Sequence, residues 1–228
     1  MRKILRKIKN FADKLPGNKS NELFWKFRHF LDRSNWPEKY VSEESLNHPH
    51  RKLLMDAILK YAPFENILEI GRASGPNLYL LALKFPEAKI YGSDISKNAI
   101  GFGKKWFAQK NIKNVEFFTS YAESSFKEFS DKSIDIIFSD AALIYLNPKK
   151  ITETLKEMLR VGRKALIFIE QHTESSSPIL DNHWIHNYKN LLKKFIPEEK
   201  IKLTKIPENI WAGKWAKYGY IIEVNSEK

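Results

Sequence analysis

The sequence predicts an α/β fold of the doubly wound kind, in which helices cover both faces of a largely parallel sheet. From about residue 45 onward, short apolar segments alternate with amphipathic segments, which is typical of buried parallel strands and the helices that connect them. The last two apolar segments, residues 200–206 and 218–224, have no helical pattern between them. They predict an antiparallel pair at one edge of the sheet.

The first half of the domain predicts two strand–helix units behind an opening helix. Residues 50–61 have helical periodicity, and the apolar run at 66–71 is short enough for a buried strand. Residues 77–85 predict a helix that ends near a proline. A strand over 89–94 then leads into a helix over 97–110, which two glycines weaken.

The second half continues the same alternation. Two apolar runs, at residues 114–119 and 133–140, predict strands. A helix over 149–161 and a strand over 164–171 follow. Residues 183–195 place Trp, Tyr, Leu and Phe side chains at helical spacing, so we expect one long helix there.

Composition limits the classes of protein to which the chain can belong. Its 228 residues fit one domain with an appendage. Cysteine is absent, which excludes disulfides, thiolate nucleophiles and cysteine-bound metals. No run of about 18 apolar residues predicts a membrane span, and the basic start lacks the apolar stretch of a signal peptide. We therefore expect a cytoplasmic protein.

Residues 1–40 predict a basic helical segment appended to a domain of residues 41–228. They hold eleven Lys and Arg against four acidic residues, so +7 of the net charge of +12 lies there. Residues 1–15 form a basic amphipathic helix by their spacing. Three interpretations stay open: this helix packs on the domain, contacts an anionic membrane surface, or binds nucleic acid. The charge distribution describes a segment more than the whole protein.

The turn after the first strand, in the string "ILEIGRASGPN", is built for close approach of a ligand. Gly71 and Gly75 allow a tight backbone, and Ala73 between them is small. A dinucleotide site needs G-x-G-x-x-G, but here Ala73 replaces the second glycine and Pro76 stands in place of the third. No G-x-x-x-x-G-K-[ST] string occurs either, so phosphate binding is disfavoured.

Two acids complete a different pattern. Glu69 lies at the end of the first strand, and Asp94 ends the second. A carboxylate at the second position can accept hydrogen bonds from both hydroxyls of a ribose. A ribose partner without a pyrophosphate site indicates an adenosine-type ligand such as S-adenosylmethionine.

At this point the chain resembles the class I S-adenosylmethionine-dependent methyltransferases. The stretch "LEIGRASGPNLYLLALKFPEAKIYGSDIS" is similar to their motifs I and II, "SIDIIFSDAALIYLNP" to their fourth strand and its loop, and "RKALIFIEQH" to their fifth strand. The resemblance covers about residues 50–225. It implies a Rossmann-like seven-stranded sheet of order 3-2-1-4-5-7-6, with strand 7 antiparallel.

The resemblance also implies cofactor contacts at two groups of positions. Near the methionine moiety we expect the residues of the first strand end and its loop, which are Glu69, Gly71, Ala73, Gly75 and Asn77. Around the adenosine and the methyl donor we expect Asp94, Ile95, Tyr121, Ala122 and Ser139. The string "TSYAE" lacks the adenine-binding aspartate that the family often has at this place.

On the acceptor side, the candidates are polar residues near the ends of the later strands. Asp140 and His172 are expected as catalytic groups, because either could take a proton from an acceptor hydroxyl; capping a turn and lying in a surface loop are their alternative roles. Tyr145 and His50 are candidate substrate contacts. His183 and His186 have helical spacing but no third ligand, so we expect no metal site.

The sequence thus predicts an enzyme that moves the methyl group of S-adenosylmethionine to oxygen or nitrogen of a small-molecule or glycan acceptor. An RNA methyltransferase that uses the basic N-terminal segment is one alternative. A non-catalytic binding module of the same fold is another, because Arg72 is a bulky cation in a loop usually given to small residues. We expect the Arg72 side chain to point outward or toward the methionine carboxylate.

Overall fold

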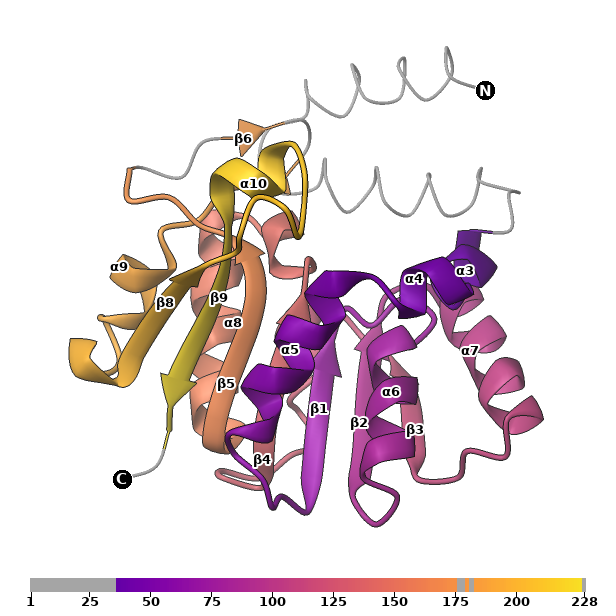
Figure 1. The fold of residues 1–228 in the computed structure, drawn as a ribbon. Helices are drawn as coiled ribbons and strands as arrows, with labels where there is room; N and C mark the ends of the chain where they lie inside the picture. The colour runs from indigo at the N-terminus through magenta and orange to yellow at the C-terminus, as the bar shows by residue number, and fades with distance from the viewer. Residues whose placement is uncertain (1–35, 176–178, 181–182, 227–228) are drawn as a thin grey trace, which may run out of the picture.

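The computed structural model describes residues 36–175, 179–180 and 183–226 (Figure 1). The amphipathic segment 1–15 and most of the expected appendage lie outside the described residues, so the interpretations of that segment stay predictions. The described chain begins with two single-turn helices, α3 (Trp36–Lys39) and α4 (Glu43–Leu46). Pro37 is buried, and its carbonyl accepts a hydrogen bond from the Ser74 hydroxyl at 2.7 Å. The end of the expected appendage therefore packs on the domain.

A seven-stranded sheet forms the centre of the molecule, in the order β3-β2-β1-β4-β5-β9-β8. Its strands are β1 (Asn66–Ile70), β2 (Lys89–Asp94), β3 (Val115–Thr119), β4 (Ile134–Asp140), β5 (Gly162–Gln171), β8 (Ile201–Lys205) and β9 (Gly219–Asn225). The first five pair in parallel, and β9 pairs antiparallel with both of its neighbours. Numbered along this sheet alone, the order is 3-2-1-4-5-7-6, which confirms the predicted topology.

Helices cover both faces of the sheet (Figure 1). On one face lie α5 (Pro49–Leu59), α6 (Pro76–Lys84) and α7 (Lys97–Gln109), which share an apolar core with β-strand side chains such as Ile67 and Ile136. On the other face lie α8 (Pro148–Val161) and α9 (Tyr188–Leu192), which pack on side chains such as Leu68 and Ile137. Neighbouring residues of β1 and of β4 thus serve opposite cores, as expected for strands covered on both faces.

The expected helix over residues 183–195 is wrong. His183–Trp184 form the short strand β7, which pairs with β6 (Ile179–Leu180), and helix α9 covers only five residues. Between β7 and α9, the His186 carbonyl does not accept a helical hydrogen bond. It accepts instead from the Thr173 N–H at 3.1 Å. This bridge holds His186 outside a helix. The final strands also differ from the prediction, since a short helix, α10 (Lys214–Tyr218), lies between them.

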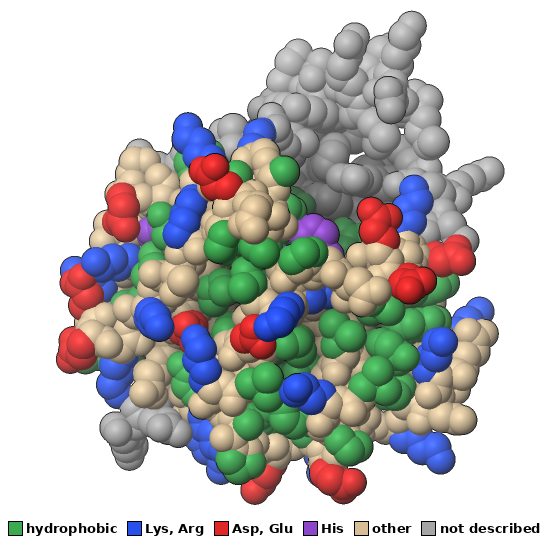
Figure 2. All heavy atoms as spheres, viewed as in Figure 1, with side chains coloured by type: hydrophobic (Ala, Val, Ile, Leu, Met, Phe, Trp, Pro, Cys, Tyr) green, Lys and Arg blue, Asp and Glu red, His purple; other side chains and the backbone are tan. Residues whose placement is uncertain are grey.

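Three single-turn 3₁₀ helices complete the described part: η1 (Ala122–Ser124), η2 (Leu143–Tyr145) and η3 (Glu198–Lys200). Within the described ranges, no helix has the length and apolar character that crossing a membrane requires. Figure 2 shows Lys and Arg side chains interspersed with acidic ones on one face of the domain. This face of the described residues therefore carries no broad, purely basic patch.

Candidate functional site

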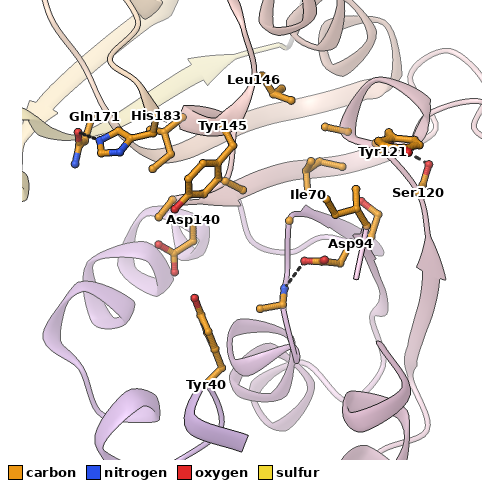
Figure 3. A pocket seen from close by; sticks show the side chains of 18 of the residues that line it. Tyr40, Ile70, Asp94, Ser120, Tyr121, Asp140, Tyr145, Leu146, Gln171 and His183 are labelled. Carbon is orange, nitrogen blue, oxygen red and sulfur yellow. Dashed lines mark hydrogen bonds between the residues drawn. The ribbon is translucent and has the colours of Figure 1, made fainter. Parts of the chain in front are cut away.

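A cavity of about 450 Å³ lies where the parallel strands end (Figure 3). Two groups of residues line it, and we name them by the strands that carry them. The β1–β3 half consists of Ile70, Gly71, Ala73, Ser93, Asp94, Ile95, Ser120, Tyr121, Ala122 and Glu123. The β4–β5 half consists of Asp140, Ala141, Ala142, Ile144, Tyr145, Leu146, Gln171 and His183, with His50, Arg51, Trp211 and Trp215 from segments that pack beside them. Trp36 and Tyr40, from α3 and the residue after it, complete the lining. Parallel sheets commonly bind ligands at this edge.

The turn after β1 is bound to the end of β2 through its backbone. Gly71, Ala73 and Gly75 all have positive φ, at 75°, 50° and 90°. The Ala73 N–H donates to Oδ2 of Asp94 at 2.8 Å, and the Ser96 N–H donates to Oδ1 at 2.8 Å. Burial raises the pKa of Asp94, while these amides and the charge of Arg72 oppose that rise. Main-chain geometry thus fixes the direction of this carboxylate.

The expected direction of Arg72 is wrong. Its side chain is 1% exposed and lies beneath the turn, with the guanidinium carbon 3.8 Å from the centroid of the Phe117 ring. Two glycines make the room: a Cβ at Gly92 would lie 2.3 Å from Cδ of Arg72, and one at Gly103 would lie 3.0 Å from its Nη1. Arg72 therefore stacks on an aromatic ring and packs against glycines. It points neither outward nor toward the methionine carboxylate, the two directions that we expected.

Glu69 and Asn77 are buried behind the cavity and do not line it. The Asn77 amide donates to Oε1 of Glu69 at 2.7 Å and to Oδ2 of Asp140 at 3.0 Å. Burial raises the pKa of Glu69 to about 8, so this side chain is protonated at neutral pH. Both residues therefore join the ends of β1 and β4, in place of the cofactor contacts that we predicted.

Asp140, at the end of β4, is the centre of the second half. Its Oδ2 accepts from Asn77, lies 3.1 Å from Nε2 of His50 and lies 3.4 Å from Nη1 of Arg51. Burial opposes ionisation, but His50, Arg51 and Asn77 outweigh it and lower the pKa of Asp140. Its Oδ1 is buried and has no hydrogen-bond partner among the described residues. The site thus holds an ionised carboxylate with acceptor capacity to spare.

Aromatic rings surround this carboxylate. The His50 ring stacks on Trp211 with centroids 4.3 Å apart, and Trp211 stacks on Trp215 at 4.0 Å. Nδ1 of His50 lies 2.5 Å from Nδ1 of His48, so one of these rings donates to the other. In Figure 3 the Tyr40 and Tyr145 rings point into the same space. The described part of this half therefore combines several aromatic rings with one carboxylate.

Glu170 was missed by sequence reasoning, although it shapes the cavity wall. It is fully buried on β5, and its Oε1 accepts from the Ser139 hydroxyl and from the amides of Ala142 and Leu143 at 2.9–3.0 Å. Burial raises its pKa to about 7. Glu170 thus holds the loop that carries Tyr145, and the predicted cofactor residue Ser139 serves this loop without lining the cavity.

His172 does not line the cavity, so the structure gives no support to its predicted role as a base. It is 2% exposed, its Nδ1 accepts from the Tyr188 N–H at 3.2 Å, and its Nε2 lies 3.1 Å from Glu174. His183 takes the cavity position instead and contacts Oε1 of Gln171 at 2.9 Å. The predicted residues that line the cavity are His50, Gly71, Ala73, Asp94, Ile95, Tyr121, Ala122, Asp140 and Tyr145.

Comparison with known proteins agrees with this architecture. A family model described as a methyltransferase domain matches residues 63–224. An S-adenosylmethionine-dependent methyltransferase from Aquifex aeolicus is similar in structure, with a TM-score of 0.57 and 19% sequence identity. The match covers 82% of this chain and 95% of that chain.

Two further solved structures share the fold. The geranyl diphosphate C-methyltransferase of Streptomyces coelicolor A3(2), in complex with S-adenosylhomocysteine, has 12% identity over 86% of this chain and 82% of its own, with a TM-score of 0.64. Phosphoethanolamine N-methyltransferase 1 of Haemonchus contortus has 16% identity over 91% of this chain and 49% of its own, with a TM-score of 0.61. Proteins with this fold thus act on chemically different acceptors.

Proposed function

Because residues 63–224 match its model, this chain belongs to the methyltransferase-domain family of S-adenosylmethionine-dependent enzymes, and we propose that it methylates oxygen or nitrogen of a small-molecule or glycan acceptor. The cofactor occupies the β1–β3 half of the cavity and the acceptor occupies the β4–β5 half. The observation that carries this proposal is the pair of carboxylates, Asp94 and Asp140, on opposite sides of one cavity (Figure 3).

The β1–β3 half suits an adenosine group. Each oxygen of Asp94 accepts one backbone amide, and a carboxylate oxygen can accept a second hydrogen bond. The ribose hydroxyls of the cofactor supply those donors. Ile95 and Tyr121 line the cavity beside this carboxylate and offer apolar and aromatic surface to the adenine ring. Gly71 lets the loop after β4 approach the turn closely, since a Cβ there would lie 2.2 Å from Cβ of Ala142.

The β4–β5 half suits an acceptor with an N–H or O–H group and a flat or apolar surface. The ionised carboxylate of Asp140 belongs to the lining of this half and would attract the N–H or O–H group of the acceptor, and the aromatic rings pack against the rest of the molecule. The cofactor, when bound, supplies an electrophilic methyl group on a sulfonium. The protein would align the acceptor with that group. As the bond from the methyl group to the acceptor forms and its bond to sulfur breaks, leaving S-adenosylhomocysteine, the ionised Asp140 would stabilise the positive charge that develops on the acceptor until the acceptor releases its proton.

Methyl transfer from radiolabelled S-adenosylmethionine into a cell extract, followed by identification of the labelled species, tests the proposal. We expect a label that survives ribonuclease and protease treatment and is found in a small molecule or glycan. A label released by ribonuclease would favour the RNA alternative. Absence of S-adenosylmethionine binding by calorimetry at millimolar ligand would contradict the enzyme proposal itself.

A further inference from the structure

Arg72 has the largest of the fully buried side chains of the described part. Burial lowers the pKa of Arg72 to about 10, against the opposing charges of Asp94 and Glu69, so the side chain remains a cation at neutral pH. Its Nε, Nη1 and Nη2 are all buried without a hydrogen-bond partner among the described residues. An isolated buried charge is costly. A counter-charge is therefore needed nearby.

Among the residues that the structure describes, the surroundings of Arg72 leave one candidate for that counter-charge. The elements packed around it contribute Gly92 of β2, Leu78 of α6, Gly103 of α7 and Phe117 of β3, none of them charged. The two acids that act on it are Asp94 and Glu69. Glu69 is protonated at neutral pH, which leaves Asp94 as the ionised partner.

The chain connects this cation to Asp94 directly. Arg72 precedes Ala73, whose N–H donates to Oδ2 of Asp94. The Arg72 N–H itself donates to the carbonyl of Ser93, the residue before Asp94, at 3.2 Å. The side chain then runs beneath Gly92, two residues before Asp94 on the same strand. The cation is thus held under the strand end whose carboxylate faces the cavity.

We propose that Arg72 is a positioning residue of the cofactor site: its buried guanidinium keeps the carboxylate of Asp94 ionised, in the form that accepts hydrogen bonds from the ribose of the cofactor. This inference rests on the proposed use of Asp94 as a cofactor ligand. It also gives a reason for glycine at positions 92 and 103, where a larger residue would collide with the Arg72 side chain. Arg72 thus supports cofactor binding from behind the loop. The sequence alone had suggested the opposite, that its bulk would hinder binding.

Calorimetric titration with S-adenosylhomocysteine from pH 4.5 to 8 tests the proposal. Wild-type affinity falls as the pH drops through the pKa of Asp94. Without the cation that pKa rises, so in Arg72→Met the midpoint of the fall moves to higher pH by about one unit or more. Arg72→Lys keeps the charge and stays close to the wild-type midpoint. Lys104→Met, an exposed cation on α7, is the control and leaves the midpoint in place.

A role in packing alone would give a different result. Arg72→Met would then melt at a lower temperature with an unchanged midpoint, and this outcome overturns the proposal. If Arg72→Met does not fold, the ¹³C NMR titration of the Asp94 carboxyl in the wild-type protein decides, with Asp94→Asn identifying the signal. An ionised Asp94 at pH 6.5 supports the proposal, and a protonated one overturns it. Failure of the wild type to bind S-adenosylhomocysteine at any pH would instead contradict the proposed function.

Discussion

The two halves of the cavity hold their carboxylates in different ways. Asp94 is oriented by main-chain amides of Ala73 and Ser96, which belong to the same two strand-end loops. Asp140 is oriented by side chains of His50, Arg51 and Asn77, which come from two helices. A charge held by backbone follows from local sequence, whereas a charge held by side chains depends on how distant segments pack.

The comparison predicts its largest effect at Asp94. Replacing Asp94 with Ala removes two charge-assisted hydrogen bonds to the ribose, each contributing about 2 kcal/mol. We expect affinity for S-adenosylmethionine to fall about 1000-fold by calorimetry. Circular dichroism and the melting temperature verify that the variant folds. A loss of less than about tenfold would mean that the ribose lies elsewhere.

Asp140→Asn is expected to separate the two halves. The rate of methyl transfer to the acceptor found in the extract falls about 100-fold, because Asn cannot take up the developing charge. Affinity for S-adenosylmethionine changes less than about threefold, since Asp140 belongs to the other half. Asp56→Asn, which removes an exposed carboxylate paired with Lys52, is the matched control. An equal loss of cofactor affinity in Asp140→Asn would remove the distinction between the halves.

The same distinction explains what sequence reasoning could find. Gly71, Asp94 and Tyr121 lie at the end of β1, β2 and β3 or within two residues of it, so strand ends and spacing are sufficient to predict their position. Trp211 and Trp215 come from the segment between the last two strands and reach the cavity only through tertiary packing. Their spacing of four residues was the one available signal.

Two errors have the same physical origin. The apolar periodicity of residues 183–195 does indicate a helix, but a bridge between Thr173 and His186 and a two-strand pairing override it. The outward direction assumed for Arg72 ignored Gly92 and Gly103, which lie 20 and 31 residues further along the chain. Contacts between residues so far apart in the chain produce no periodic pattern in the local sequence, so they could not be predicted from it.

Glu69 lies between the halves, and its protonation predicts a pH dependence of stability. Its pKa is raised from 4.5 to about 8 in the folded protein, so the unfolded chain loses this proton first as the pH rises. The contribution of Glu69 to the free energy of unfolding is fully present below about pH 4.5. It decreases toward pH 8, by at most about 1.4 kcal/mol per pH unit.

Glu69→Gln is therefore expected to flatten the decline in the free energy of unfolding, measured with urea between pH 5 and 8. Gln retains an acceptor for the Asn77 amide. Glu87→Gln, at an exposed position, controls for the loss of one acidic residue elsewhere. Equal slopes for wild type and Glu69→Gln would show that Glu69 is ionised over this pH range in the folded protein, and would contradict the prediction.

The two glycines of α7 offer the smallest and most closely matched test of how the β1–β3 half is supported. A Cβ at Gly103 would lie 2.8 Å from the Ser74 carbonyl and 3.0 Å from Nη1 of Arg72, whereas a Cβ at Gly101 would meet nothing within 4 Å. Gly103→Ala is expected to destabilise the protein by about 1–3 kcal/mol and to weaken cofactor binding, because it displaces the turn. Gly101→Ala is expected to stabilise it by about 0.5–1 kcal/mol, as Ala favours a helix over Gly. Urea unfolding and calorimetry measure both variants, and equal effects in the two would mean that α7 does not hold the cofactor turn in place.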